Sequence, residues 1–138
     1  MSNYVIIGGS AGIGKELVNT LAQNGNQVYT TYNENVVQDS TNVRYQKFNV
    51  LTDELNTSEL PDTIDGLAYC PGSINLKPFH RFKEEDLIED YKLQTLGAVK
   101  VLNHLLPKLK KSTHASVVLF STVAVQNGFS FHAQVAMS

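Results

Sequence analysis

An apolar run at the start of this chain leads without a break into three glycines and then into a helical pattern. The glycines Gly8, Gly12 and Gly14 are spaced Gly-x-x-x-Gly-x-Gly. Glycine lets the backbone turn tightly and approach a ligand closely, because it has no Cβ. The N–H groups and the positive dipole end of the following helix then face an anion. Because a strand precedes the turn and a helix follows it, the pattern predicts a dinucleotide diphosphate site rather than a flexible turn.

Strand and helix patterns alternate along the whole chain. The expected strands are 3–7, 27–31, 43–48, 64–69 and 116–120. The expected helices are 12–23, 52–60 with Thr52 or Asp53 as its cap, 84–110 and 131–138, and residues 32–42 form a loop. Right-handed crossovers between such strands give a parallel sheet with helices on both faces. We therefore predict one α/β domain over residues 1–138, a doubly wound Rossmann-like sheet with strand order 3-2-1-4-5.

Composition excludes several classes of function. A net charge of −2 leaves no basic stripe for nucleic acid. No run approaches the roughly 18 apolar residues of a membrane span, and no signal-peptide pattern is present. His80, His104 and His114 lack metal-ligand spacing, so no metal site is expected. The single cysteine, Cys70, forms no internal disulfide, which fits a reducing cytoplasm.

Four segments together resemble the short-chain dehydrogenase/reductase family in their order and spacing. They are Gly8-Gly9-Ser10-Ala11-Gly12-Ile13-Gly14, Asn49-Val50-Leu51-Thr52-Asp53, Tyr69-Cys70-Pro71-Gly72 and Val118-Leu119-Phe120-Ser121-Thr122. The resemblance implies a nicotinamide dinucleotide over the carboxyl ends of the strands. It also implies hydride transfer to or from a small carbonyl or alcohol substrate, and a homo-oligomer. The crevice at the switch point of such a sheet is where ligands bind on physical grounds as well.

The adenosine end of this expected site follows from the second strand. An acidic residue there normally holds the ribose 2′-hydroxyl of NAD, whereas this strand ends in Thr31-Tyr32-Asn33. The missing carboxylate favours NADP over NAD, although Tyr32 also fits simple packing at the strand end. Asn49 replaces the family's adenine-binding aspartate as a neutral acceptor. The residues expected to contact the dinucleotide are Gly8, Ser10, Gly12, Ile13, Gly14, Tyr32, Asn33, Asn49, Val50, Pro71 and Gly72.

The catalytic end departs from the family pattern. The family's serine position falls on Thr122, beside Ser121, and its asparagine position falls on Gln94. The family's tyrosine position is Val135, which has no ionisable proton, and the lysine position lies one residue beyond Ser138.

Three side chains of this region have alternative interpretations. His132 lies three residues before Val135, on the same helical face, and has a suitable pKa for proton transfer. A histidine at a helix start is also commonly a cap or surface residue, and the Ser121 and Thr122 hydroxyls also fit caps of the next loop.

Two functions therefore remain open. The first is an NAD(P)-dependent oxidoreductase that is complete only in a longer parent, of which this chain is the N-terminal part, truncated on its C-terminal side. Its fifth strand is then an exposed edge. The second is a catalytically inactive dinucleotide-binding sensor or partner subunit. Because the proton-transferring side chains are missing, we expect no appreciable turnover from residues 1–138 alone.

Overall fold

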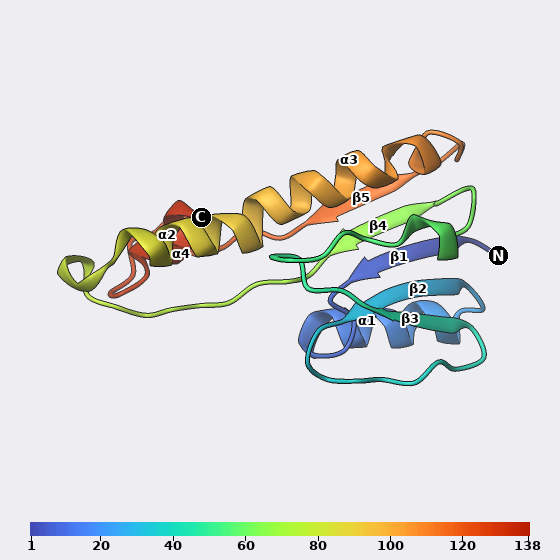
Figure 1. Ribbon diagram of the computed structural model, residues 1–138, viewed down its shortest axis with the longest axis horizontal. Coiled ribbons are helices and arrows are strands. Elements are labelled where there is room, and N and C mark those ends of the chain that lie inside the picture. Colours follow the sequence, from blue (N-terminus) through green and yellow to red (C-terminus); the bar gives the residue numbers. More distant parts are fainter.

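The fold is a single parallel sheet with helices on both faces, seen in a computed structural model that describes residues 1–138 (Figure 1). The strands are β1 (Asn3–Ile7), β2 (Gln27–Tyr32), β3 (Val43–Lys47), β4 (Gly66–Tyr69) and β5 (Ser116–Leu119). Their order is β3-β2-β1-β4-β5, and every neighbouring pair is parallel. The predicted doubly wound α/β fold and its strand order are confirmed. The order reverses between β1 and β4, where a ligand crevice is expected.

Four α-helices connect and cover these strands. They are α1 (Gly12–Gln23), α2 (Glu84–Tyr91), α3 (Gly97–Leu109) and α4 (Ala133–Met137). Figure 1 shows α1 on one face of the sheet and α3 along the other, with α2 and α4 together beyond the end of the sheet. No helix has both the length and the apolar character that crossing a membrane requires.

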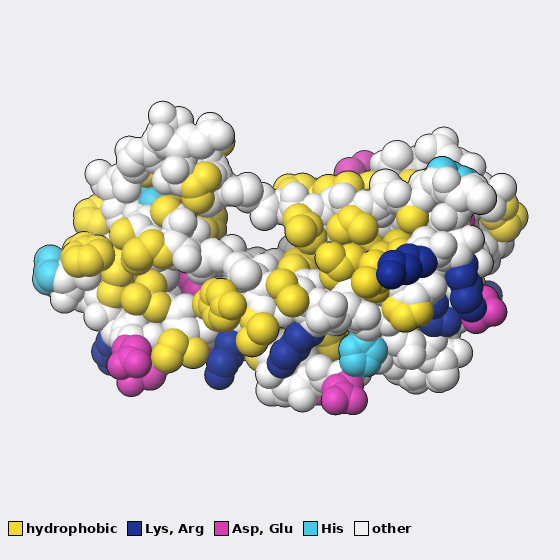
Figure 2. Space-filling view, turned by 90° about the horizontal axis from the view of Figure 1, so that it is seen from above, with side chains coloured by type: hydrophobic (Ala, Val, Ile, Leu, Met, Phe, Trp, Pro, Cys, Tyr) yellow, Lys and Arg dark blue, Asp and Glu magenta, His cyan; other side chains and the backbone are white.

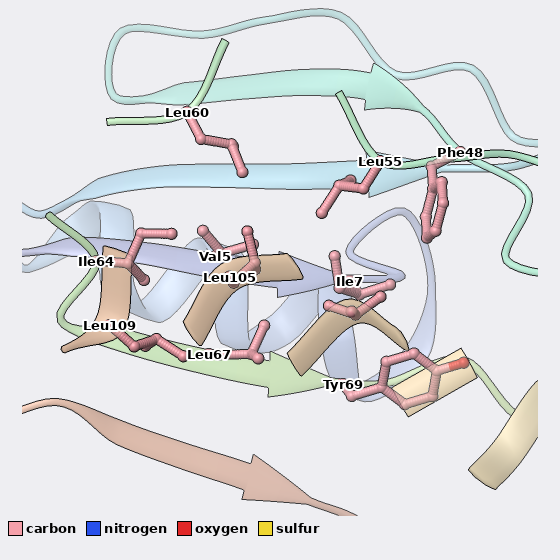
Figure 3. Close-up of a cluster of buried hydrophobic side chains, with 11 residues drawn as sticks. Val5, Ile7, Phe48, Leu55, Leu60, Ile64, Leu67, Tyr69, Leu105 and Leu109 are labelled. Atoms are coloured by element: carbon pink, nitrogen blue, oxygen red, sulfur yellow. The ribbon is translucent and has the colours of Figure 1, made fainter. Parts of the chain in front are cut away.

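Alternating side chains of β1 belong to the two halves of the core. Ile6 packs in one cluster with Val18 of α1, whereas Val5 and Ile7 pack with Leu105 of α3 in the other, larger cluster (Figure 3). This alternation is the period of two that a strand imposes on its side chains. Full burial of each such side chain contributes about 1.5–3 kcal/mol. The buried runs therefore fix β1 at the centre of the sheet and the glycine turn at its carboxyl end.

The helix predicted over 52–60 is wrong, because only a 3₁₀ turn at Thr57–Glu59 forms there. The Asp53 carboxylate accepts a hydrogen bond from the Asn49 N–H at 2.8 Å, and the Asn49 side chain accepts one from the Leu51 N–H at 3.0 Å. Such side-chain bonds give the backbone an alternative to a helix. Asp53 therefore closes a turn instead of capping a helix.

The region predicted as one helix over 84–110 contains a π-helical turn at Lys92–Leu96 between α2 and α3. The Tyr69 hydroxyl donates a hydrogen bond to the Leu93 carbonyl in this turn. A Cβ on Gly97 would lie 2.5 Å from Val50 Cγ2 and still closer to the Tyr69 oxygen. The turn and the glycine after it therefore make room for Tyr69 below the helix. The last helix, expected from 131, begins at Ala133.

The outermost strand, β5, has all four of its residues exposed, as expected for an uncovered edge. Its apolar side chains Val117, Val118 and Leu119 are 41%, 47% and 57% exposed. The space-filling view from above shows a broad apolar area over the body of the molecule (Figure 2). An edge of this kind presents unpaired backbone groups together with apolar side chains.

Candidate functional site

The glycine turn has the geometry that its spacing predicts. Gly8 and Gly12 have φ angles of 82° and 55°, in the left-handed region that favours glycine. A Cβ on Gly14 would lie 2.9 Å from the carbonyl carbon of Gly8 and still closer to its oxygen. The start of α1 therefore packs directly on the turn, and only glycine allows that approach.

Thr31, at the end of β2, holds the turn and was not singled out from the sequence. Its hydroxyl accepts a hydrogen bond from the Gly8 N–H at 2.9 Å, and its carbonyl accepts one from the Gly9 N–H at 3.0 Å. Thr31 is buried, at 3% exposed. The signal was present in the predicted strand order, because a hydroxyl at the end of β2 must lie beside the end of β1.

The beginning of α1 fits the diphosphate of a dinucleotide. The residue before the helix, Ala11, supplies no side-chain cap, and the first turn holds no acidic residue. The first N–H groups of a helix have no partners within the helix. A Cβ on Gly12 would meet nothing within 4 Å, so open space lies in front of the turn. Uncapped donors, a positive dipole end and free space are together what an anion needs.

A cavity of about 720 Å³ begins at this turn and extends to α4. Figure 2 shows a hollow between the end of the molecule that contains α2 and α4 and the body that contains the sheet. The cavity, which we call the cleft, brings together seven of the residues predicted for the site. They are Ile13, Pro71, Gly72, Gln94, Ser121, Thr122 and Val135. Gly8 packs behind Pro71, since a Cβ there would lie 3.2 Å from the Pro71 nitrogen.

Hydroxyl and amide groups line the part of the cleft near α4. The Thr122 hydroxyl accepts a hydrogen bond from the Ala124 N–H at 3.2 Å, which is the capping role considered above. It keeps its own hydrogen available to donate. The Gln94 amide donates to the Ser73 carbonyl at 3.1 Å and to the Ser138 hydroxyl at 3.3 Å. Gln94 therefore joins the π-helical turn, the segment after β4 and α4.

Val135 and His132 lie in different surroundings. Val135 is 6% exposed and lines the cleft, whereas His132 does not line it. The His132 Nδ1 lies 2.6 Å from the Ser130 carbonyl, and its ring is 5.5 Å from that of Phe129. His132 precedes α4 at the N-cap position but makes no side-chain cap bond. The structure therefore brings Val135 to the hydroxyl pair and leaves His132 outside.

Only two titratable side chains line the cleft, Tyr69 and Cys70. Burial raises the pKa of the Tyr69 hydroxyl and of the Cys70 thiol, because removal from water disfavours the charged form. Both groups are therefore protonated at neutral pH. The Tyr69 hydroxyl is already engaged with the Leu93 carbonyl.

The residues expected at the adenosine end lie outside the cleft. Asn33 is exposed, Tyr32 is half-buried at the end of β2, and neither makes a side-chain hydrogen bond. Asn49 uses one lone pair of its side-chain oxygen in the turn to Leu51 and keeps the other. Val50 lines a separate cavity of about 320 Å³ between the 48–55 segment and α3. Ser10 lies half-buried in the glycine turn.

Comparisons with known proteins give one consistent family. A family model described as short chain dehydrogenase matches residues 2–135, and a search of curated proteins finds no match. A short-chain dehydrogenase from Streptomyces avermitilis has a TM-score of 0.80 at 17% identity, over 99% of this chain and 55% of its own. A short-chain dehydrogenase/reductase from Serratia marcescens has a TM-score of 0.82 at 19% identity, over 99% and 64%. ElxO, solved with NADP bound, has a TM-score of 0.80 at 17% identity, over 98% and 61%.

This chain thus spans between about half and two thirds of the length of these solved structures. At such identities the structural likeness establishes the fold, and the family model adds the family. The chain belongs to the short-chain dehydrogenase family.

Proposed function

We propose that this chain is the dinucleotide-binding part of an NAD(P)-dependent oxidoreductase acting on a small carbonyl or alcohol substrate. The observation that carries the proposal is the glycine turn at the mouth of the cleft, with Gly14 packed on Gly8 and uncapped N–H groups at the start of α1. We also propose that it self-associates and works in the reducing cytoplasm, which its single cysteine supports.

The cofactor preference that we propose is NADP. Neither Tyr32 nor Asn33 carries a negative charge that would repel a 2′-phosphate, and neither carries a positive charge that would bind it. The preference for NADP therefore depends only on the absence of this repulsion. The expected difference in affinity between NADPH and NADH is therefore small.

In this proposal the residues of the cleft hold the substrate oxygen. The nicotinamide, when bound, supplies or accepts the hydride. The Thr122 hydroxyl donates a hydrogen bond to the substrate oxygen, and Ser121 stands beside it as a second donor. Gln94 fixes α4 against the segment after β4, which shapes the opposite wall. Reduction of a carbonyl also requires a proton at the substrate oxygen. No acid with a pKa near neutrality faces this oxygen, so that proton has no efficient source within the chain.

A specific observation favours the alternative, a dinucleotide-binding sensor or partner subunit without catalysis. Val135 is buried at the position where the family has its tyrosine, and the two ionisable groups of the cleft have raised pKa values. Binding would then be retained and turnover absent. The two functions differ in whether a carbonyl substrate accelerates NADPH oxidation.

Calorimetric titration of residues 1–138 with NADPH and NADH tests the binding on which both functions depend. We expect binding of both nucleotides, and a loss of at least about tenfold in affinity for Gly14→Ala, because the new Cβ displaces the turn. Gly128→Ala is the matched control, since a Cβ there meets nothing within 4 Å. Circular dichroism checks that both variants are folded. Equal affinity of wild type and a folded Gly14→Ala for both nucleotides contradicts the proposal.

A further inference from the structure

A second cavity, of about 250 Å³, lies where α2, α4 and the segment after β4 meet. Its polar wall consists of Ser73, Asn75, Asp86, Glu89, Asp90 and Gln134. We call it the acidic pocket. Ser73 belongs to its wall and to that of the cleft, so the two cavities are neighbours.

Asp90 is a buried carboxylate without a counter-ion. It is 5% exposed and forms no ion pair. One of its oxygens accepts a hydrogen bond from the Gln134 amide, and the other lies 3.5 Å from the Ser73 hydroxyl. Asp86, one turn earlier in α2, differs because the Lys77 ammonium lies 2.5 Å from it. A buried charge is costly unless it is paired, so Asp90 favours a cation in this pocket.

Gln134 supplies a second, independent signal from the opposite wall. It is 1% exposed, and its amide nitrogen donates to the Asp90 carboxylate and to the Asp86 carbonyl. These two acceptors fix the orientation of the amide, because a flipped amide would set its oxygen against both. The Gln134 Oε1 therefore stays where it is, and it has no hydrogen-bond partner. A buried acceptor without a donor is unfavourable, because it has lost its hydrogen bonds to water and gained none in the protein.

We propose that the acidic pocket binds the primary ammonium group of a small organic amine. One N–H of the ammonium donates to the Asp90 carboxylate, and the positive charge of the ammonium balances the charge of that carboxylate. A second N–H donates to the Gln134 oxygen, and the third is left for the Ser73 hydroxyl. No three His, Cys, Asp or Glu side chains converge closely enough to hold a metal ion. An ammonium needs only one carboxylate beside neutral acceptors. The proposal concerns binding alone and does not depend on the oxidoreductase function.

Titration of residues 1–138 with n-butylammonium chloride, at constant ionic strength set with NaCl, tests the proposal. We expect a rise in the thermal midpoint and saturable heat in calorimetry, and neither with n-butanol, the neutral analogue. Asp90→Asn keeps the size of the side chain and removes its charge. We expect it to lower the affinity for the amine at least about tenfold, the effect of losing a charged hydrogen-bond partner. Glu85→Gln, an exposed charge removal on the same helix, is the matched control and keeps the affinity.

Several outcomes overturn the proposal. They are an equal response to n-butanol, an unchanged amine affinity in Asp90→Asn, and Asp90-dependent binding of MgCl₂ without any binding of the amine. If Asp90→Asn does not fold, Ser73→Ala decides, because it removes one of the three acceptors of the proposed ammonium and Ser73 is exposed, so its change leaves the core intact. A severalfold weaker amine affinity in that variant supports the ammonium site, and an unchanged affinity counts against it.

Discussion

The Tyr69 hydroxyl donates a hydrogen bond to the Leu93 carbonyl, so the last residue of β4 is tied to the π-helical turn above it. The Tyr69 ring belongs to the core between the sheet and α3, and its oxygen points toward the helix (Figure 3). Gly97 leaves the space that this oxygen occupies. One side chain thus links the core, the floor of the cleft and the irregular part of the helix.

Tyr69→Phe removes this hydroxyl and leaves the Leu93 carbonyl without that partner. We expect a loss of about 1–3 kcal/mol in the free energy of unfolding, the cost of an unpaired buried acceptor. Urea unfolding measures it, with the slope on urea concentration unchanged. A variant as stable as the wild type would show that the bond contributes nothing.

A double-mutant cycle with Gly97→Ala sharpens this test. The single change Gly97→Ala forces a Cβ against Tyr69 and Val50 and destabilises by about 1–3 kcal/mol through overpacking. In the pair with Tyr69→Phe, part of that clash is relieved. The two losses are therefore expected to sum to more than the loss of the double variant.

The sequence predicts the parts of this molecule that depend on local pattern. The strand order and the glycine turn follow from the alternation of elements and from three glycines. The π-helical turn at 92–96 does not, because it depends on Tyr69, which is distant along the chain. The predicted helix over 52–60 also fails, because the side-chain hydrogen bonds of the Asn49–Asp53 turn take its place.

The residues of the candidate site likewise include some that the sequence predicts and some that it does not. Seven predicted residues meet in the cleft: five follow strands or begin α1 at one edge of the sheet, and Gln94 and Val135 come from the π-helical turn and α4. Thr31 was missed because its role is a contact between strands that the residue type alone does not reveal. Gln134 was missed because α2 and α4 meet only in the folded chain.

Thr31→Val keeps the shape of the side chain but leaves the Gly8 N–H without its acceptor. We expect a loss of about 1–3 kcal/mol in stability and a severalfold weaker affinity for NADPH, because the glycine turn loses its support. Chemical denaturation and calorimetric titration measure the two effects. Thr41→Val, in the exposed loop before β3, is the control and should change neither.

Val135→Tyr adds a tyrosine hydroxyl to the part of the cleft that holds Ser121 and Thr122. Residues 1–138 are expected to show no appreciable oxidation of NADPH with simple carbonyl substrates. The variant is expected to raise the rate by up to about 10²-fold, the lower end of general acid–base catalysis. Val135→Phe matches the added size without the hydroxyl and should remain inactive. Rapid oxidation of NADPH by the wild type would contradict the prediction. If that activity were then lost in His132→Ala, His132 would be identified as the acid.

Asp65 predicts a pH dependence of stability. Hydrogen bonds from the Asn3 N–H at 2.8 Å and the Ser112 hydroxyl at 2.7 Å hold the pKa of the Asp65 carboxyl below its usual range. A lowered folded-state pKa gives stability that is fully present above the unfolded-state value of about 3.9 and lost as the pH falls further. Asp65→Asn is expected to be less stable at pH 7 and to lose less on acidification. Urea unfolding from pH 7 to pH 2 measures this, with the exposed Asp62→Asn as the control.

The exposed edge at β5 predicts self-association that rises with concentration. Val118 is 47% exposed on the edge strand, and we expect Val118→Lys to shift the weight-average mass toward the monomer. Sedimentation equilibrium over a hundredfold range of concentration measures this. Val36→Lys, which adds the same charge at a loop residue that is 73% exposed, should leave the association unchanged.

The π-helical turn also sets the direction in which the side chains of α3 point around the helix axis. Asp90 and Val101 are eleven residues apart, which in an uninterrupted α-helix amounts to roughly 1100°, so they would share one face to within about 20°. The π-helical turn accommodates roughly one extra residue, so the directions of Asp90 and Val101 around the helix axis differ by about a quarter of a rotation from that arrangement. Asp90 can thus face α4 while Val101 faces the sheet. Deleting a single residue between 92 and 96 would therefore make the helix regular and leave Asp90 and Val101 facing as they do now, whereas a regular helix of unchanged length would rotate the carboxylate toward the hydrophobic core.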